Sequence, residues 1–496
     1  MNTLGPERVA RTEFDRMVYS HDFASLPKIA LLQWRLYPDF VVLPQTTEEV
    51  SAIVKLSDES GLPIVPRGGG TGWYGGSVPN RGGVLIDMRK MNKVRAFDPQ
   101  ARTITVEAGA TWSDIVAYAE ARGLTLPSLP TNALASTVGG AINSDVVGFG
   151  AFRNGALRQI VRDLEIVLPN AQTLHTASAG DAVGHFADLT PFLFGAEGTL
   201  GLVTAATLRL DPKPDVMKAV AYGFGSLRAA ASFVQSVVDS GVLAYHVSLL
   251  DKEHLVFERA LRTDAPEPRD LVLVALAGAK DDVADQEKTL DALAAKASAG
   301  KRPLEESEGL WAQRFRMYSA RRMSRGLVVA NNVVPLAALP EACDTARELI
   351  RKMKLNGAVQ AYPIDATSAI LAPYVLMDET TPSGGTALGY VKKMGDAAFE
   401  VGGHPMGLGL FMVFNLRIMH GRAALYTAYV KDVFDPKRKV NPGKTIEVWT
   451  KFQFPGIRAI PPPAMRVGLD LAAFLRRIKP TQDKFVRSYE RGKEAD

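Results

Sequence analysis

A glycine-rich stretch from Pro66 to Gly76 constrains this chain more than any other segment, because six of its eleven residues are glycine. Glycine allows the backbone to approach a ligand closely, and successive backbone N–H groups can then form an anion-binding concavity. Arg67 adds a fixed positive charge at the start of the stretch. These features predict a pyrophosphate-binding loop; a turn-rich hairpin without a ligand is the other interpretation.

Within this stretch, Gly70 to Gly75 matches the G-x-G-x-x-G spacing of dinucleotide-binding folds. That motif must open a helix, so that the helix N-terminus meets the phosphate. Here Ser77 to Gly83 contains a proline and two glycines and cannot form a helix, and Val84 to Asp87 has the pattern of a strand. The sequence therefore argues against a Rossmann fold.

The length of 496 residues predicts two or more domains. From about residue 40 to 210, short apolar runs alternate with capped helices, and Thr46 to Glu49 has the pattern of a capping box. Further helices are predicted from Trp112 to Arg122, from Asp281 to Ala297 and from Pro340 to Met353. Strands are predicted at 62–65, 103–107, 271–276 and 327–330. The second half predicts a separate layer of strands and helices, and the fold class is α+β.

The composition excludes several kinds of site. Cys343 is the single cysteine, so the chain can form no internal disulfide and cannot ligate an iron–sulfur cluster or a cysteine-based zinc ion by itself. A net charge of +5 is mild for this length and predicts no nucleic-acid partner. No apolar run approaches the roughly 20 residues of a membrane span, and no signal peptide is evident. We expect a cytoplasmic protein, either soluble or peripheral to the inner face of a membrane.

Three more clusters accompany the glycine-rich stretch: Thr137 to Gly140, Asn143 to Gly148, and Gly195 to Thr204. In this order and spacing, the clusters resemble the FAD-binding domain of the vanillyl-alcohol-oxidase/p-cresol-methylhydroxylase (PCMH-type) superfamily, and within it the glycolate oxidase and D-lactate dehydrogenase branch. Other matching stretches are Gly82 to Met88, Val106 to Gly109, Gly155 to Leu157, Leu168-Pro169, Phe434 to Lys437 and Asn441 to Lys444. The resemblance covers about residues 35 to 448.

The resemblance implies four parts. These are a two-subdomain FAD domain over 1–215 (about 1–95 and 96–215), a ferredoxin-like α+β cap over 216–425, a segment over 426–460 that returns to the FAD domain, and a linker with a tail over 461–496. FAD would be held without a covalent bond, because Thr71 stands where some members have a histidine. The cofactor-binding residues implied are Pro66, Arg67, Gly68, Gly69, Gly70, Thr71, Gly72, Gly76, Ser77, Pro130, Asn132, Thr137, Gly139, Gly140, Asn143, Ser144, Gly148, Glu197, Gly198, Val203 and Asn441.

The chain departs from the family at the cap. Where the hydroxy-acid dehydrogenases of this branch carry two metal-binding histidines, this sequence has Tyr362 and Ala369, and Gly403 replaces a carboxylate ligand. Without those ligands a tight divalent site is implausible, so we expect no catalytic metal. The substrate should accordingly differ from small chelating 2-hydroxy acids.

Two residues are predicted to act on the substrate. His404 suits the base that takes the hydroxyl proton while a hydride goes to flavin N5, although a hydrogen-bonded structural role is the other interpretation. Arg314 resembles the arginine that binds the substrate carboxylate in this family, and an ordinary solvated arginine is equally consistent with its basic surroundings.

Together these features predict an FAD-dependent dehydrogenase of a hydroxy acid or related alcohol, with a small-molecule substrate. Electrons would pass to a partner, an iron–sulfur or other electron-transfer protein, or to a quinone. An oxygen-using alcohol oxidase and a flavin-carrying electron-transfer or scaffold subunit are the alternatives. The tail carries an amphipathic, basic helical pattern around Val467, Leu471 and Phe474. It is predicted to pack on its own protein, or to dock a partner protein or a membrane surface.

Overall fold

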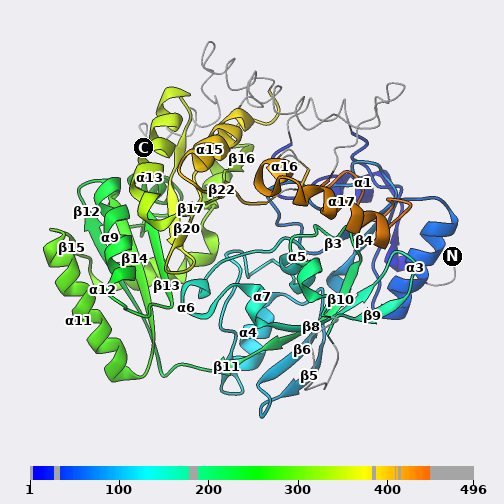
Figure 1. The fold of residues 1–496 in the computed structure, drawn as a ribbon, viewed down its shortest axis with the longest axis horizontal. Helices are drawn as coiled ribbons and strands as arrows, with labels where there is room; N and C mark the ends of the chain where they lie inside the picture. The colour runs from blue at the N-terminus through cyan, green and yellow to red at the C-terminus, as the bar shows by residue number, and fades with distance from the viewer. Residues whose placement is uncertain are drawn as a thin grey trace.

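The computed structural model describes residues 4–26, 34–177, 188–381, 387–407, 409–410 and 415–446. Two sheets form the first half of the chain and a larger sheet forms the second half, with the two halves side by side (Figure 1). The fold is of the α+β class, as the sequence predicts. The predicted linker and tail, residues 461–496, lie outside the described residues.

The first sheet has the strand order β1-β2-β4-β3, and its three longer strands run parallel: β2 (Phe40–Val42), β4 (Val84–Asp87) and β3 (Ile64–Arg67). Helix α3 (Thr47–Glu59) packs its apolar face, with Val50 and Val54, on this sheet. Thr46 caps α3, and the Thr46 hydroxyl accepts a hydrogen bond from the Glu49 N–H. The Glu49 carboxylate accepts a hydrogen bond from the N–H of Gln45, one residue before the cap. The glycine-rich stretch leaves the end of β3.

The second sheet is antiparallel, with the order β5 (Val94–Asp98), β6 (Thr103–Glu107), β10 (Leu202–Arg209), β8 (Val161–Val167) and β9 (Thr173–His175). Helices α4 (Trp112–Glu120) and α5 (Val138–Asn143) pack against it with the buried side chains of Trp112, Ile115 and Ile142. Helix α4 confirms the helix predicted from Trp112, but it ends at Glu120, two residues earlier than predicted. Gly123 then turns the chain with a φ of +79°.

The second half is built on an eight-stranded sheet. Its order is β15 (Gly300–Lys301), β12 (Val216–Phe224), β14 (Asp270–Gly278), β13 (His246–Leu250), β19 (Gln360–Pro363), β20 (Ser368–Leu371), β17 (Asn332–Pro335) and β22 (His404–Pro405). Helices α9 (Leu227–Asp239), α11 (Lys280–Lys296), α13 (Leu339–Lys352) and α15 (Leu388–Glu400) share one apolar core with one face of this sheet. The other face is turned toward the first half, because Phe149 contacts His246 and the Tyr362 hydroxyl donates to the Val147 carbonyl. We call this half the cap.

The helices predicted at 281–297 and 340–353 are confirmed as α11 and α13, each displaced by one residue. A smaller sheet of β16 (Gly326–Val329), β21 (Tyr374–Met377) and β18 (Gly357–Ala358) adjoins the cap. The remaining described elements are β1 (Val9–Ala10), α1 (Glu13–Val18), β7 (Leu124–Thr125), α6 (Ala151–Asn154), α7 (Leu157–Ile160), α8 (Thr190–Leu193), β11 (Asp211–Pro212), α10 (Lys252–Leu261), α12 (Leu304–Ala312), α16 (Asn415–His420), α17 (Ala423–Phe434) and the 3-10 turns η1 (Pro6–Arg8), η2 (Met88–Lys90), η3 (Arg314–Arg316), η4 (Ser319–Met323) and η5 (Leu336–Ala338).

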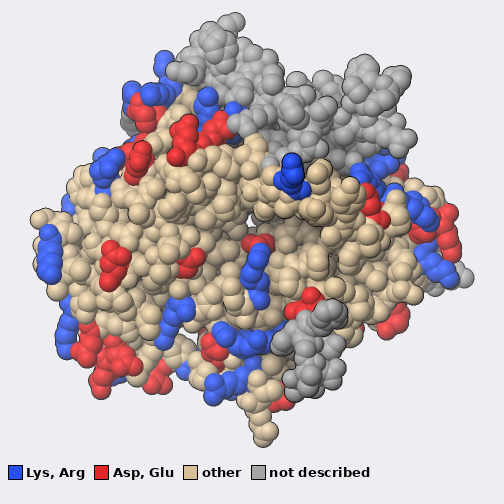
Figure 2. All heavy atoms as spheres, viewed as in Figure 1, with Lys and Arg blue, Asp and Glu red and all other residues tan. Residues whose placement is uncertain are grey.

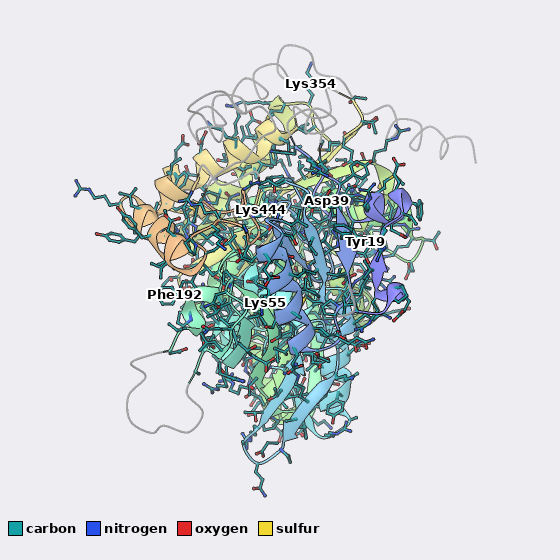
Figure 3. All side chains as sticks on the ribbon, turned by 90° about the vertical axis from the view of Figure 1, so that its right-hand side faces the viewer. Tyr19, Asp39, Lys55, Phe192, Lys354 and Lys444 are labelled. Atoms are coloured by element: carbon teal, nitrogen blue, oxygen red, sulfur yellow. The ribbon has the colours of Figure 1, made fainter. Side chains whose placement is uncertain are left out.

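After the cap, the chain returns to the first half through α17, the last helix described. The Lys431 ammonium is buried there, where it donates hydrogen bonds to the carbonyl oxygens of Thr199 and Val440 and pairs with Asp435. Residues 439–441 then run alongside β3, with the N–H of Ile64 bonded to the Lys439 carbonyl. Lys444 lies inside the molecule, where this return meets the N-terminal strands (Figure 3).

Candidate functional site

A cavity of about 1370 Å³, including the part open to solvent, lies where the two halves of the molecule face each other. The surface is hollowed at this place, near the centre of the view in Figure 2. The first half contributes the glycine-rich stretch and the loops around α5 and Glu197, and the cap contributes Tyr318, Asn331 and Tyr362. The wall runs from the glycine-rich stretch to the cap, so a ligand bound here would contact both halves of the molecule.

The glycine-rich stretch passes close to the opposite wall of the cavity. A Cβ atom on Gly68 or Gly69 would come well within 3.0 Å of the Thr137 hydroxyl or the Ala135 carbonyl oxygen, respectively. Gly70 has a φ of +65°, and its carbonyl accepts a hydrogen bond from the N–H of Phe23. Only glycine fits these positions, so the sequence pattern reflects both close approach and backbone conformation.

Arg67 places a positive charge at the start of this stretch, where Asp22 and Asp87 act on it electrostatically. Its guanidinium donates a 2.7 Å hydrogen bond to the carbonyl of His21 and lies over the ring of Tyr19, 5.5 Å from its centroid. It forms no ion pair with a residue of the described ranges. Burial lowers the pKa of Arg67, which means that the charged form is poorly solvated and that a nearby anion would stabilise it.

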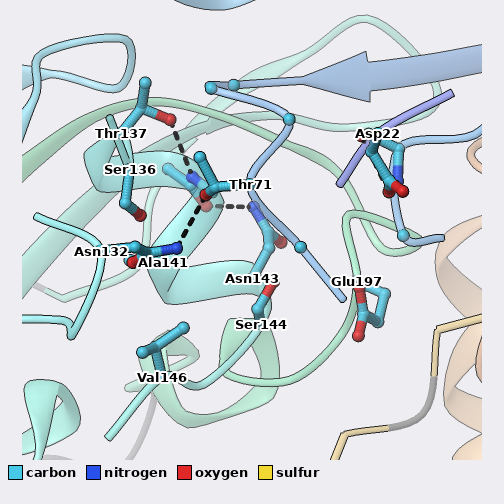
Figure 4. A pocket seen from close by; sticks show the side chains of 18 of the residues that line it. Asp22, Thr71, Asn132, Ser136, Thr137, Ala141, Asn143, Ser144, Val146 and Glu197 are labelled. Atoms are coloured by element: carbon cyan, nitrogen blue, oxygen red, sulfur yellow. Dashed lines mark hydrogen bonds between the residues drawn. The ribbon is translucent and has the colours of Figure 1, made fainter. Parts of the chain in front are cut away.

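The opposite wall is a set of cross-linked loops (Figure 4). The Asn132 amide donates to the Thr71 hydroxyl over 2.8 Å, and Asn143 accepts from the N–H of Gly198 over 3.1 Å. Thr137 caps α5 by accepting from the N–H of Gly140. The side-chain oxygen of Asn132, Oδ1, is buried and has no hydrogen-bond partner among the described residues. A buried acceptor without a partner costs about 1–3 kcal/mol, so this atom fits a ligand that carries a donor.

Most of the residues that the sequence assigns to the cofactor line this cavity. They are Pro66, Arg67, Gly68, Gly69, Gly70, Thr71, Gly72, Gly76, Ser77, Asn132, Thr137, Gly139, Gly140, Asn143, Ser144, Glu197, Gly198 and Val203. Pro130, Gly148 and Asn441 do not lie on the wall. Gly148 lets the backbone of residues 129–131 pass closely, because a Cβ there would collide with the Leu129 carbonyl. Glycine at position 148 is therefore needed for the close packing of these two segments.

The two residues predicted to act on the substrate are not on the cavity wall either. His404 lies in β22 at the edge of the cap sheet, and its Nδ1 is 3.1 Å from the carbonyl oxygen of Pro405. The wall there is formed by Met406 and Gly407, which follow it in the chain. Arg314 donates to the Trp311 carbonyl and stacks on the rings of Trp311 and Phe315. The sequence cannot show which way these side chains turn, and their catalytic roles stay predictions.

Several wall residues were not predicted. Trp73 and Tyr74 lie inside the glycine-rich stretch, and Tyr362 stands where the resemblance implied a metal-binding histidine, so each had a signal in the sequence. Asp22, Tyr318, Asn331, Met406 and Gly407 had none, because they reach the cavity only through the tertiary fold.

Two carboxylates, the buried Asp22 and the half-buried Glu197, lie on the wall near Gly76. Asp22 accepts hydrogen bonds from the N–H of Ala24 and from the N–H and hydroxyl of Ser77. Burial raises the pKa of Asp22, and it raises the pKa of Glu197 to about 7. The Lys444 ammonium, buried close by, has its pKa lowered by burial to about 7 and donates a 2.8 Å bond to the Val78 carbonyl. Glu197 can therefore change its protonation state near neutral pH.

No three His, Cys, Asp or Glu side chains in the described ranges gather closely enough to hold a metal ion. The positions of Tyr362 and Ala369 in neighbouring strands carry no metal-binding atoms apart from the Tyr362 phenol. The absence of a catalytic metal stays a prediction. None of the helices described is long and apolar enough to cross a bilayer.

Comparisons with known proteins agree with this geometry. Residues 38–177 match the FAD binding domain family, and residues 213–445 match the C-terminal domain of the FAD linked oxidases. The chain is 30% identical over 365 residues to the glycolate oxidase subunit GlcD of Bacillus subtilis, covering 73% of this chain and 75% of that protein. It is 28% identical over 428 residues to the mitochondrial D-lactate dehydrogenase [cytochrome] of Arabidopsis thaliana, covering 82% and 73% of the two chains.

Solved structures show the same fold at low sequence identity. p-Cresol methylhydroxylase superposes with a TM-score of 0.77 at 17% identity, over 90% of this chain and 95% of that chain. Alkyldihydroxyacetonephosphate synthase superposes with a TM-score of 0.70 at 21% identity, over 88% and 84% of the two chains. The predicted PCMH-type fold is thus confirmed.

Proposed function

The chain belongs to the family of FAD-linked oxidases, and on that premise we propose that it dehydrogenates a hydroxy acid or related alcohol, with FAD as the acceptor of the hydride. FAD as the cofactor and a CH–OH group as the electron donor follow from the family. The substrate, the electron acceptor and the role of each residue are our proposal.

The single observation that carries the proposal is the composition of the cavity wall. One continuous cavity has an anion-binding glycine loop with Arg67 on the FAD side and the uncharged side chains of Tyr318, Asn331 and Tyr362 on the cap side. A cofactor held by the loops would therefore present its reactive end to a substrate held by the cap. The residues fit the group, since Arg67 forms no ion pair with a described residue and the side-chain oxygen of Asn132 has no donor among them.

The chain supplies binding, orientation and proton transfer. Arg67, Gly68 and Gly69 would hold the pyrophosphate, and Thr137, Asn143 and the backbone of Val203 would hold the rest of the cofactor. FAD would be held without a covalent bond, since Thr71 occupies the loop position. Glu197 is the wall residue that we assign to accept the hydroxyl proton, because a general base works best when its pKa lies near the working pH. His404 is the other proton acceptor and would have to turn toward the cavity.

Electrons would then leave to a partner protein or a quinone. Cys343 is the only cysteine of the chain and is buried, so the chain has no thiolate set for a cluster of its own. Oxygen as the direct acceptor is the alternative. The names of the relatives, a glycolate oxidase subunit and a cytochrome-linked dehydrogenase, support transfer to a second protein.

The test is an anaerobic absorbance titration of the purified yellow protein with D- and L-hydroxy acids and aromatic alcohols. We expect one class of compound to bleach the visible flavin band. Oxygen uptake during turnover then separates an oxidase from a dehydrogenase, because only an oxidase consumes oxygen without an added acceptor.

A second candidate function is a flavin-carrying electron-transfer or scaffold subunit. It is favoured by Tyr362 and Ala369 at the family's metal-ligand positions and by the placement of His404 and Arg314 away from the cavity wall. Under this alternative no substrate bleaches the flavin, although FAD is bound.

A further inference from the structure

Three tyrosines from distant parts of the chain line the cap end of the cavity. Tyr74 belongs to the glycine-rich stretch, Tyr318 lies between η3 and η4, and Tyr362 belongs to β19. The pKa of Tyr318 is raised well above its usual value, chiefly by burial and further by the nearness of Tyr362 and Tyr74. All three phenols are therefore neutral at physiological pH and keep their protons.

Two of the three hydroxyl groups are occupied by the protein. The Tyr74 hydroxyl donates to the Val329 carbonyl over 3.3 Å and accepts from the N–H of Asn331 over 3.2 Å. The Tyr362 hydroxyl donates to the Val147 carbonyl over 3.1 Å. The Tyr318 hydroxyl, by contrast, forms no hydrogen bond with any residue that the structure describes. It is thus the phenol of this group left for a ligand.

The ring of Tyr318 is held in place on two sides. It meets Trp73 edge to face at 4.6 Å and Tyr374 edge to face at 5.5 Å between ring centroids. Tyr374 is itself anchored, because its hydroxyl lies 2.9 Å from Nδ1 of His254.

The backbone on both sides of Tyr318 is also tied down. The Met317 carbonyl accepts a hydrogen bond of 3.2 Å from the Gln360 amide, and the hydroxyl of Ser319 donates to Glu258. A hydrogen-bonding group fixed in this way loses little entropy when it binds a ligand.

We propose that the Tyr318 hydroxyl donates a hydrogen bond to the oxygen of the substrate's CH–OH group and so sets the orientation of the carbinol carbon in the cavity. This rests on the proposed function, which places the alcohol at the cap end. Tyr318 does not accept the hydroxyl proton, because the buried phenol remains protonated. The same hydrogen bond would persist to the carbonyl oxygen of the product, which is also an acceptor.

The variant that tests the role is Tyr318→Phe, which removes the hydroxyl and keeps the ring between Trp73 and Tyr374. The matched control is Tyr222→Phe in β12, because the Tyr222 hydroxyl donates a 2.7 Å bond to Asp291 away from the cavity. Since Tyr318 has no described hydrogen-bond partner to lose, we expect its variant to keep the FAD content and thermal midpoint of the wild type. The control loses a real hydrogen bond and should be the less stable of the two.

The first readout is binding without turnover. The probe is 2-phenylpropan-2-ol, a tertiary alcohol that has no carbinol hydrogen and cannot be dehydrogenated. Calorimetric titration into the FAD-loaded protein should give a dissociation constant about three- to tenfold higher for Tyr318→Phe than for wild type or Tyr222→Phe, the loss expected for one neutral hydrogen bond. The second readout is the anaerobic rate of flavin bleaching by the best alcohol of the titration, which should fall by about tenfold or more in Tyr318→Phe alone.

The outcomes separate the two claims. Equal probe affinity and equal bleaching rates in Tyr318→Phe and wild type would overturn the role of Tyr318 and leave the dehydrogenase intact. If the probe binds wild type more tightly than Tyr318→Phe but no alcohol bleaches the wild type, the binding role of Tyr318 is supported and the proposed dehydrogenase activity is wrong. If the wild type neither binds the probe nor is bleached, both claims fail.

Discussion

The side-chain amide of Asn441 donates a hydrogen bond of 2.6 Å to the carbonyl oxygen of Glu197, a residue 244 positions earlier in the chain. A second bond of 2.8 Å goes from the same amide to the carbonyl of Gly76. Both partners line the cavity, whereas Asn441 does not. Asn441 has a φ of +43°, a conformation that asparagine tolerates better than most residues. The C-terminal return thereby holds two loops of the cofactor cavity together.

Replacing Asn441 with alanine should loosen both loops. Two buried carbonyl oxygens lose their donor and a residue with less tolerance for positive φ is introduced, so we expect a loss of about 2–4 kcal/mol in the free energy of unfolding. The variant should also release FAD more readily. Urea unfolding and the flavin absorbance left after desalting would measure the two effects.

Asn170→Ala is the matched control, because the exposed Asn170 bonds only within its own turn to Gln172. It should cost little stability and leave the FAD content unchanged. If Asn441→Ala keeps the stability and the FAD content of the wild type, the two hydrogen bonds of the Asn441 amide are not needed to hold the loops together.

Gly69→Ala should abolish FAD retention, because the added Cβ would come well within 3.0 Å of the backbone carbonyl of Ala135. A backbone atom cannot give way as a flexible side chain can, so the loop must move off the cavity wall. The absorbance ratio of flavin to protein after desalting checks this expectation.

The control is Gly309→Ala, since Gly309 lies in α12 and a Cβ there meets nothing within 4 Å. Alanine in a helix interior should stabilise by about 0.5–1 kcal/mol relative to glycine. Full FAD occupancy in Gly69→Ala would mean that the loop does not contact the cofactor.

Glu197→Gln should change how stability depends on pH. The pKa of Glu197 rises from 4.5 to about 7 in the folded protein, so its favourable contribution is complete below pH 4.5 and is lost as the pH rises through about 7. The amide variant removes this loss. It should therefore match the wild type near pH 5 and exceed it at pH 8, by at most about 3 kcal/mol.

Lys444 has the opposite effect on the free energy of unfolding, because its pKa is lowered from 10.5 to about 7. Its unfavourable contribution is relieved as the pH rises from about 7 to 10.5, which is above the range in which Glu197 titrates. Urea unfolding midpoints of wild type and Glu197→Gln, measured between pH 5 and 7.5 at a constant FAD concentration, therefore report the titration of Glu197 separately from that of Lys444. A constant difference between variant and wild type across this range would contradict a titrating Glu197. If Glu197 also accepts the substrate proton, the acid limb of the bleaching rate near pH 7 should disappear in the variant.

His404→Gln should keep the bleaching rate within a few fold of wild type, because His404 lies off the cavity wall with Nδ1 near the Pro405 carbonyl. The exposed His175, which pairs with Asp163, provides the control variant His175→Gln. A loss of a hundredfold or more in His404→Gln alone, with FAD retained, would restore the histidine as the base. General-base removal commonly has an effect of about that size.

Much of the cofactor side of the site could be predicted from the sequence. The loop from Pro66 to Gly76 and the turns at Thr137 and Gly195 need particular backbone conformations, and glycine, threonine and asparagine at fixed spacing report those conformations directly. The cap side could not be predicted in the same way. Tyr318 and Asn331 lie in segments with no motif or spacing that predicts a binding site. His404 and Arg314 were chosen by resemblance alone.

The sequence by itself determined the α+β class, the glycine-rich loop and the exclusion of a Rossmann helix, and it predicted the division into a cofactor half and a cap. Each depends on residues adjacent in the chain, whose local conformational preferences act over a few positions. Only the tertiary structure decided which side chains reach the cavity. That choice follows from the packing of the cap sheet against the loops of the FAD half, which brings Tyr74, Tyr318 and Tyr362 together and leaves His404 at a sheet edge. Residues far apart in the chain are brought together only by tertiary contacts, so their proximity leaves no pattern in the local sequence.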